Sequence, residues 1–358
     1  MTKNNDNQQD FIFEELGTLS KKVDSIVGLP IILEDRLRQM LARLNRMAKL
    51  GNYSSEFDTL SRYIETISTV PWSAKTEDKL DLTQARKVLD ASHYGMDSVK
   101  ERILEYLATM TLISRRGGDM IAKSPVLLFV GLQGVGKTTL SKSIAEVLGR
   151  KFVRIAMGGI GSTLEIRGKS KSFPQADPGQ IVKALISAKV RNPVILLDEI
   201  EKASGERGLL QDIMAVLLEI LDPNQNYNFR DHYIDFPTNL SEVLFICSAN
   251  NTGTISAALM DRMEVIKMPS YTDQEKIVIS KDYLLPEIME RSGLIDGELV
   301  IEESLWPGIV RPFGFDSGIR SLGRTLEAVC RKVAKQIVEG SAKQVILTEE
   351  NLKYYLPQ

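Results

Sequence analysis

The segment GLQGVGKT, from Gly131 to Thr138, constrains the fold of this chain more than any other stretch. It fits the pattern G-x-x-x-x-G-K-[ST], follows the apolar run PVLLFVG and opens the helical pattern KTTLSKSIAEVLG. In that context a glycine-rich backbone curls its N–H groups around phosphate oxygens, and the helix N-terminus adds partial positive charge. We therefore predict an ATP site in which Lys137 reaches the β- and γ-phosphates and the Thr138 hydroxyl binds Mg²⁺. The residues predicted to hold the nucleotide here are Gly131, Gly134, Val135, Gly136, Lys137, Thr138 and Thr139.

A second motif, VILLDE, is an apolar strand pattern that ends in two carboxylates, Asp198 and Glu199. An uninterrupted apolar run predicts a strand buried on both faces, and the tips of such strands are where parallel sheets bind ligands. We expect Asp198 to hold Mg²⁺ through water and Glu199 to act as the general base that polarises the attacking water.

Two further polar residues lie where they can serve the same chemistry. Asn250 ends the apolar run SEVLFICSAN, and it either holds the catalytic water or the γ-phosphate or simply caps the strand in a turn. Arg262, in LMDRMEVI, either supplies positive charge to a neighbouring subunit's site or forms a surface salt bridge to Asp261 or Glu264.

The chain as a whole predicts an α/β protein. From Pro125 to Met268 the runs PVLLFVG, FVRIAM, NPVILLDE and SEVLFICSAN alternate with helical patterns, which indicates a mainly parallel sheet flanked by helices. We predict an α/β nucleotide-binding domain over 71–268 and a small helical lid domain over 269–358, with a short strand at KQVILT. They are preceded by an N-terminal region over 1–70. We predict that this region consists of a polar tail without structure over 1–10 and a helical segment. Leu33, Leu37, Met40, Leu44 and Met47 share one seam of that segment, which packs either on the chain's own body or in a coiled coil with a partner.

The composition narrows the function classes. A formal charge of −2 gives no broad cationic field, so nucleic-acid binding is not expected. Two distant cysteines, Cys247 and Cys330, and two histidines make neither a disulfide framework nor a zinc site. The N-terminus is polar and no apolar run is long enough to cross a bilayer, so we expect a soluble cytoplasmic protein with reduced thiols.

With these motifs in view, the chain resembles the ATPase part of the Lon proteases, within the AAA+ superfamily. The resemblance rests on ASHYGMDSVKERILEYLA, GRKFVRIAMGG, EIRG, NPVILLDEIEK, LDPNQN, DHYIDFPTNLSEVLFI, DRMEVI and GIRSLGRTLEAVCRKVAK. It implies that Tyr94, Gly95 and Met96 form part of the adenine pocket. It also implies that Asn250 is the first sensor, Arg262 the arginine finger and Arg320 the second sensor, in hexameric rings that thread protein substrates through a pore.

The same resemblance gives a role to GKSKSFPQADPG, a stretch with no helix or strand period. Its aromatic residue, Phe173, aligns with the pore-loop residue that grips substrate, and the alternative is that Phe173 is tucked against its own domain. Pro174 stands where the family has an aliphatic partner, and KSK replaces a His-Arg-Arg type run. The family's Gly-Asp-Pro after the acidic strand is also missing, since this chain reads GLLQDIMAV there. These departures put substrate handling in doubt rather than ATP chemistry.

Three functions therefore compete. The sequence stops at NLKYYLPQ, where a Lon protease continues into a peptidase domain with a serine–lysine dyad, so we expect no peptide-bond cleavage by this chain alone. The first function is an ATP-driven ring that unfolds or pulls protein. The second is the ATPase part of a split or truncated protease, whose peptidase is either a separate chain or a part of the protein beyond this sequence. The third is a nucleotide-regulated binding or DNA-handling module.

Overall fold

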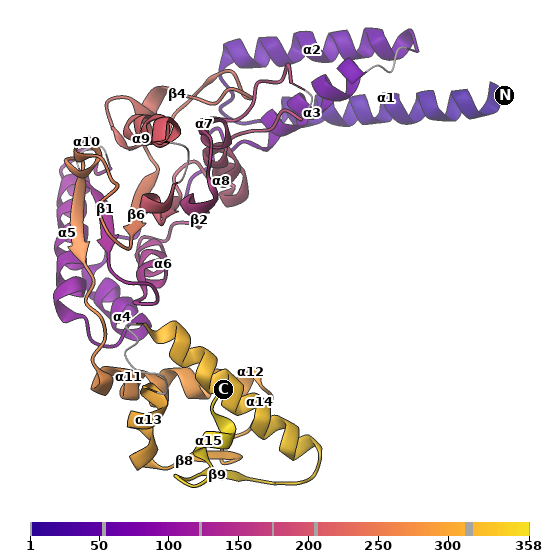
Figure 1. The fold of residues 1–358 in the computed structure, drawn as a ribbon. Coiled ribbons are helices and arrows are strands. Elements are labelled where there is room, and N and C mark those ends of the chain that lie inside the picture. Colours follow the sequence, from indigo (N-terminus) through magenta and orange to yellow (C-terminus); the bar gives the residue numbers. More distant parts are fainter. Residues whose placement is uncertain are drawn as a thin grey trace.

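A computed structural model describes residues 2–51, 55–121, 124–173, 175–203, 207–311 and 318–357. In Figure 1 these residues form an arc in which N-terminal helices, a central α/β body and a C-terminal helical lid follow one another. None of the described helices is both long and apolar enough to span a membrane.

A five-stranded parallel sheet forms the centre of the body, in the order β2-β3-β6-β1-β7. Its strands are β1 (Val126–Val130), β2 (Phe152–Ala156), β3 (Val194–Asp198), β6 (Leu244–Ala249) and β7 (Met263–Lys267). The mainly parallel sheet is confirmed, and the first four strands match the predicted runs. The edge strand β7 was missed because its segment, MEVIK, contains two charged residues and forms no continuous apolar run.

Alternate residues of each central strand pack into two separate cores. On β3, Ile195 and Leu197 join the core under one helical layer, while Val194 and Leu196 join the other. The first layer consists of α7 (Thr163–Arg167), α8 (Gln180–Ala188), α9 (Arg207–Leu221) and α10 (Ala257–Met260). The second consists of α4 (Leu82–Ser92), α5 (Asp97–Arg115) and α6 (Lys137–Val147). A two-stranded antiparallel pair, β4 (Phe229–Arg230) and β5 (Pro237–Thr238), lies outside this sheet.

The N-terminal segment folds as three helices, α1 (Thr2–Asp24), α2 (Ile31–Lys49) and α3 (Ser55–Thr69). Leu33, Leu37 and Leu44 are fully buried in one core with α1, α3 and residues of the body, so the predicted seam packs on the chain itself. The expectation of a tail without structure is wrong for the backbone from Thr2 onward. No glycine or proline interrupts the helix before Gly17, so the polar residues continue it.

The C-terminal lid is small and mainly helical, as predicted. It comprises α11 (Asp273–Ile279), a π-helical turn (Ser280–Leu284), α12 (Leu285–Arg291), α13 (Trp306–Val310), α14 (Ile319–Val338) and α15 (Leu352–Tyr355). The strand predicted at KQVILT is present as β9 (Val345–Leu347), which pairs in parallel with β8 (Leu299–Ile301). Trp306, Leu326 and Val333 lie in the centre of the lid's own core.

Candidate nucleotide site

The loop between β1 and α6 adopts a conformation that depends on glycine. Gly134 and Gly136 have φ values of 81° and 99°, in the region that side chains disfavour, and Gly136 caps the N-terminus of α6. A Cβ on Gly136 would lie 2.8 Å from His93 Nε2, and one on Gly131 would lie 2.7 Å from the Met268 carbonyl oxygen. A side chain at Gly131, Gly134 or Gly136 would strain this loop or collide with its neighbours. The close approach of its backbone to a phosphate group therefore requires these glycines.

Lys137, the first residue of α6, is 7% exposed and points back into the loop. Its ammonium group donates to the carbonyl oxygens of Gly131 and Leu132 and, over 2.9 Å, to Asn250 Oδ1. Burial lowers the pKa of Lys137, and the negative charges of Glu201, Asp198 and Glu199 partly oppose that shift.

The two carboxylates at the end of β3 have different environments. Asp198 is buried, and its two oxygens accept hydrogen bonds from Ser248 Oγ and, over 2.6 Å, from Arg154 Nε. Glu199 is more open, with Oε1 at 3.0 Å from Lys202 Nζ and 3.3 Å from Gln133 Nε2. Burial alone would raise the pKa of Glu199, but the hydrogen bond and charge of Lys202 and the Asn250 amide outweigh it and lower that pKa.

Asn250 follows β6 and joins Lys137 to a residue that the sequence reasoning missed, Glu201. The Asn250 backbone N–H and Nδ2 both donate to Glu201 Oε1, over 3.0 and 2.6 Å. The signal available in the sequence was a third carboxylate in the run DEIE, two residues beyond Glu199.

A cavity of about 760 Å³ opens beside this loop, between the body and the lid. Tyr94, Lys137, Thr138, Thr139 and Arg320 line it, with Arg320 contributed by the first turn of the lid helix α14. The rings of Tyr94 and of Tyr283, in the lid's π-helical turn, lie 6.4 Å apart.

Three other residues predicted to bind the nucleotide are not among those that line this cavity. Gly95 and Met96 both have positive φ at the start of α5, and the Met96 side chain is buried in the core. Val135 is also buried, in the same core.

A second cavity, of about 630 Å³, adjoins the site on its acidic side. Glu201, Lys202 and Asn250 line it, and Gln133 lines both cavities. The structure thus brings the predicted lysine, threonine, carboxylates and asparagine to the ends of β1, β3 and β6.

Arg262 lies apart from this group. It precedes β7, and its guanidinium pairs with the buried Asp222 over 2.7 Å. The partners considered from the sequence, Asp261 and Glu264, are not the ones observed, and Glu264 instead pairs with Arg102 over 3.0 Å.

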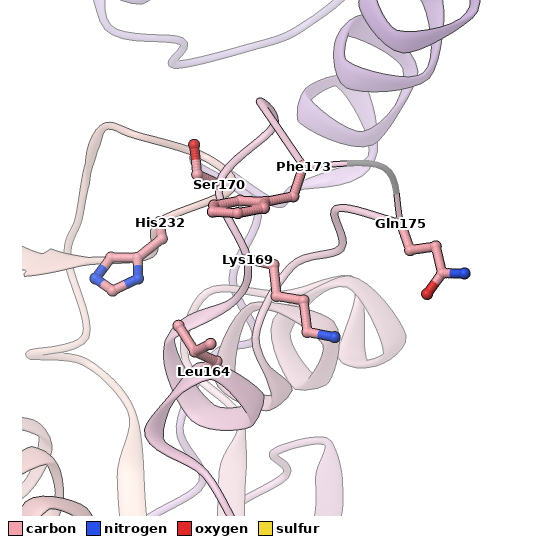
Figure 2. Close-up of a pocket in the computed structure, with 6 residues that line it drawn as sticks. All are labelled: Leu164, Lys169, Ser170, Phe173, Gln175 and His232. Atoms are coloured by element: carbon pink, nitrogen blue, oxygen red, sulfur yellow. The ribbon is translucent and has the colours of Figure 1, made fainter.

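Phe173 projects from the loop of residues 168–179, and 65% of its surface is exposed, so it is not tucked against the body. Figure 2 shows its ring beside His232, above Leu164 and Lys169. Together with Ser170 and Gln175 these residues line a mostly apolar cavity of about 370 Å³. Pro174, the other residue predicted for substrate contact, lies outside the described residues.

This sheet order, glycine loop and lid define the chain as a P-loop ATPase module of the AAA+ class. Residues 127–270 match the family described as "ATPase family associated with various cellular activities (AAA)". Residues 290–346 match the "Lon protease AAA+ ATPase lid domain".

Two curated relatives are similar to nearly the whole of this chain. The chain is 41% identical over 350 residues to Lon protease 2 of Thermus thermophilus and 43% identical over 344 residues to Lon protease 1 of Bacillus subtilis. Each match covers 96% of this chain and 43% of the relative. The chain belongs to the Lon family, of which it carries the AAA+ ATPase module, and it spans less than half the length of these relatives.

Proposed function

We propose that this chain binds ATP with Mg²⁺, hydrolyses it, and uses the energy to unfold or move polypeptide within a ring of subunits. The observation that carries the proposal is the convergence of Lys137, Asn250 and the Asp198–Glu199 pair beside a cavity to which the lid contributes Arg320.

The residues around the main cavity suit a nucleoside triphosphate. Backbone N–H groups of the glycine loop and the N-terminus of α6 would receive the phosphates, and Lys137 would exchange its carbonyl partners for phosphate oxygens. Tyr94 would stack on the base, and Arg320 would sense the phosphates from the lid.

The donor set also fits Mg²⁺. The Thr138 hydroxyl is an oxygen ligand of the kind that this ion takes together with phosphate and water, and the Asp198 carboxylate would hold the ion through one of those waters. When bound, the ion would neutralise negative charge on the phosphates. Arg154, which holds Asp198 Oδ2 in this structure, would have to share that carboxylate.

Hydrolysis would use Glu199 as the general base. Its lowered pKa leaves the carboxylate ionised at neutral pH, so it can accept a proton from water while the water oxygen bonds to the γ-phosphorus. The bond from phosphorus to the β–γ bridging oxygen breaks, and ADP and inorganic phosphate leave. Lys202 must release Glu199 for this step, and Arg262 would supply positive charge to a neighbouring subunit's site.

The substrate-handling part of the proposal rests on Phe173. A large exposed ring with few rotatable bonds gives sequence-independent contact with an extended chain, and the apolar cavity beside it suits side chains of that chain.

We would test the proposal by measuring ATP hydrolysis against protein concentration for wild type, Glu199→Gln and Arg262→Ala, with molecular mass measured in parallel. We expect activity to rise with assembly. Glu199→Gln should bind ATP but turn over at least about a hundredfold more slowly, because the base is lost. Arg262→Ala should bind ATP and lose turnover. A monomer with full activity in Arg262→Ala would contradict the shared site.

Phe173→Ala completes this experiment. It should keep ATP turnover and lose the unfolding of a model protein substrate, because the ring is the predicted grip. Unchanged unfolding would refute the role of Phe173 while leaving the ATPase intact.

A second candidate function follows from the relatives, which are named proteases and are more than twice as long as this chain. The chain would then be the ATPase part of an ATP-dependent protease. Recovery of no peptidase with the tagged chain from its native cells would count against this alternative.

A further inference from the structure

The amide of Asn250 is held in one orientation by two neighbours of opposite character. Its Nδ2 and backbone N–H donate to Glu201 Oε1, and its Oδ1 accepts from the Lys137 ammonium group. A carboxylate can only accept hydrogen bonds and an ammonium group can only donate them, so the amide cannot be turned over without losing both contacts.

This orientation bears on the roles that the sequence left open for Asn250, which were to hold the catalytic water, to hold the γ-phosphate, or to cap the strand in a turn. The side chain presents an acceptor to the phosphate side of the site, and a γ-phosphate oxygen is an acceptor as well. Asn250 Oδ1 therefore cannot hydrogen-bond directly to the phosphate. A water molecule, in contrast, has the hydrogen that this oxygen needs.

Glu201 is itself fixed in place. It lies in the turn that follows β3, where Thr254 Oγ1 donates to its carbonyl oxygen over 3.0 Å. Its second carboxylate oxygen, Oε2, is buried and has no hydrogen-bond partner among the described residues. Among the described residues, the hydrogen bonds that the Glu201 carboxylate accepts therefore come from Asn250.

We propose that Glu201 is a positioning residue, which locks Asn250 so that its oxygen aims at the attacking water once Lys137 has moved to the phosphates. The inference rests on the proposed ATP hydrolysis. It predicts that Glu201 influences the chemical step through Asn250 and leaves nucleotide affinity alone.

The test compares Glu201→Ala, Glu201→Gln, Asn250→Ala and the double variant Glu201→Ala/Asn250→Ala, each measured for kcat and for the Kd of ATP. Glu201→Ala should lower kcat roughly ten- to a hundredfold with little change in Kd, because a misplaced acceptor costs rate rather than binding. Glu201→Gln should recover most of kcat, since its amide oxygen still accepts both N–H groups. The double variant should be no slower than Asn250→Ala, since both changes remove the same contact.

Glu264→Ala serves as the matched control, because it removes a paired glutamate from β7, away from the site, and should leave kcat unchanged. The inference is wrong if Glu201→Ala keeps wild-type kcat, if its Kd rises in step with the loss of kcat, or if the two single effects multiply. A wild-type protein that hydrolyses no ATP would instead refute the proposed function and this inference with it.

Discussion

At the scale of single residues, the environment of Asp222 explains how Arg262 is held. The carboxylate is buried and accepts hydrogen bonds from Arg262, from the backbone and side chain of Asn224, and from Gln225. Burial by itself would raise the pKa of Asp222, but these donors lower it to about 2. Asp222 therefore stays ionised, and keeps its arginine, at neutral and mildly acidic pH.

We predict that Asp222→Asn lowers the free energy of unfolding by about 2 kcal/mol at pH 7, because a charged hydrogen-bonded partner is lost. A carboxylate with a depressed folded-state pKa stabilises the fold above its unfolded pKa, near 4, and loses that effect as the pH falls toward 2. Urea unfolding from pH 7 to pH 3 should show the difference from wild type shrinking below pH 4. Glu264→Gln, which breaks a more exposed pair, should cost no more than about 0.5 kcal/mol. A difference that stays constant down to pH 3 would contradict this account.

Motif spacing predicted Lys137, Asp198, Glu199 and Asn250 as site residues, because each ends or follows a recognisable strand. It could not identify Ser248 and Arg154, which hold Asp198. Their roles depend on β3 lying between β2 and β6, and strand order is set by packing that a single sequence does not display. The same limit hid Asp222 as the partner of Arg262.

At the scale of elements, the loop of residues 168–179 is tied to the N-terminal helices. Lys171 Nζ lies 4.5 Å from the centre of the Tyr63 ring on α3, and the Tyr63 hydroxyl donates to the Ile234 carbonyl oxygen over 2.8 Å. The fully buried Asp231 accepts from the N–H of Gly179, which closes the other end of the loop. Helix α3 therefore helps to set the position of Phe173.

We predict that Lys171→Met speeds amide hydrogen exchange in residues 169–173 roughly two- to fivefold, because a cation–π contact of about 0.5–1 kcal/mol is lost. The methionine keeps the apolar stem, so the midpoint of thermal unfolding should stay within about 1 °C of wild type. Tyr63→Phe should instead lower stability by about 1–2 kcal/mol, since a buried carbonyl loses its donor. Unchanged amide hydrogen exchange in Lys171→Met would mean that the contact between Lys171 and the Tyr63 ring does not hold the loop of residues 168–179.

The elements themselves were largely predictable, because the apolar strands and the helical seam around Leu33 and Leu37 have clear periods. The start of α1 was missed, since the polar residues after Met1 carry no period and their helix extends a longer amphipathic one.

At the scale of the whole molecule, the lid meets the nucleotide loop backbone to backbone. The Ile319 N–H at the start of α14 donates to the Gly134 carbonyl oxygen over 3.1 Å. A Cβ on Gly318 would lie 2.5 Å from the Gln133 carbonyl oxygen, a contact that real side chains do not make. The lid can approach the loop this closely only because residue 318 is glycine.

We therefore expect Gly318→Ala to push the lid away from the loop and to weaken nucleotide binding several-fold. Its φ of −116° suits alanine, so the cause would be the contact and not backbone strain. Titration with a fluorescent ADP analogue would measure the effect. Gly308→Ala, whose Cβ would meet only Leu352 Cδ2 at 3.8 Å, controls for a substitution elsewhere in the lid. Equal affinities for both variants would show that the junction does not shape the site.

The two outer strands of the sheet have a consequence for how copies of this chain behave in solution. An edge strand offers unpaired backbone groups to which a strand of another molecule can add, and charged side chains oppose such aggregation. On β7, Arg102 covers the Val265 carbonyl oxygen, and on β2 the half-exposed Arg154 stands at the centre of the strand. Arg154 thus protects an open edge while it holds Asp198. An Arg154 variant that loses activity because it aggregates would therefore resemble one that loses activity because Asp198 is no longer held.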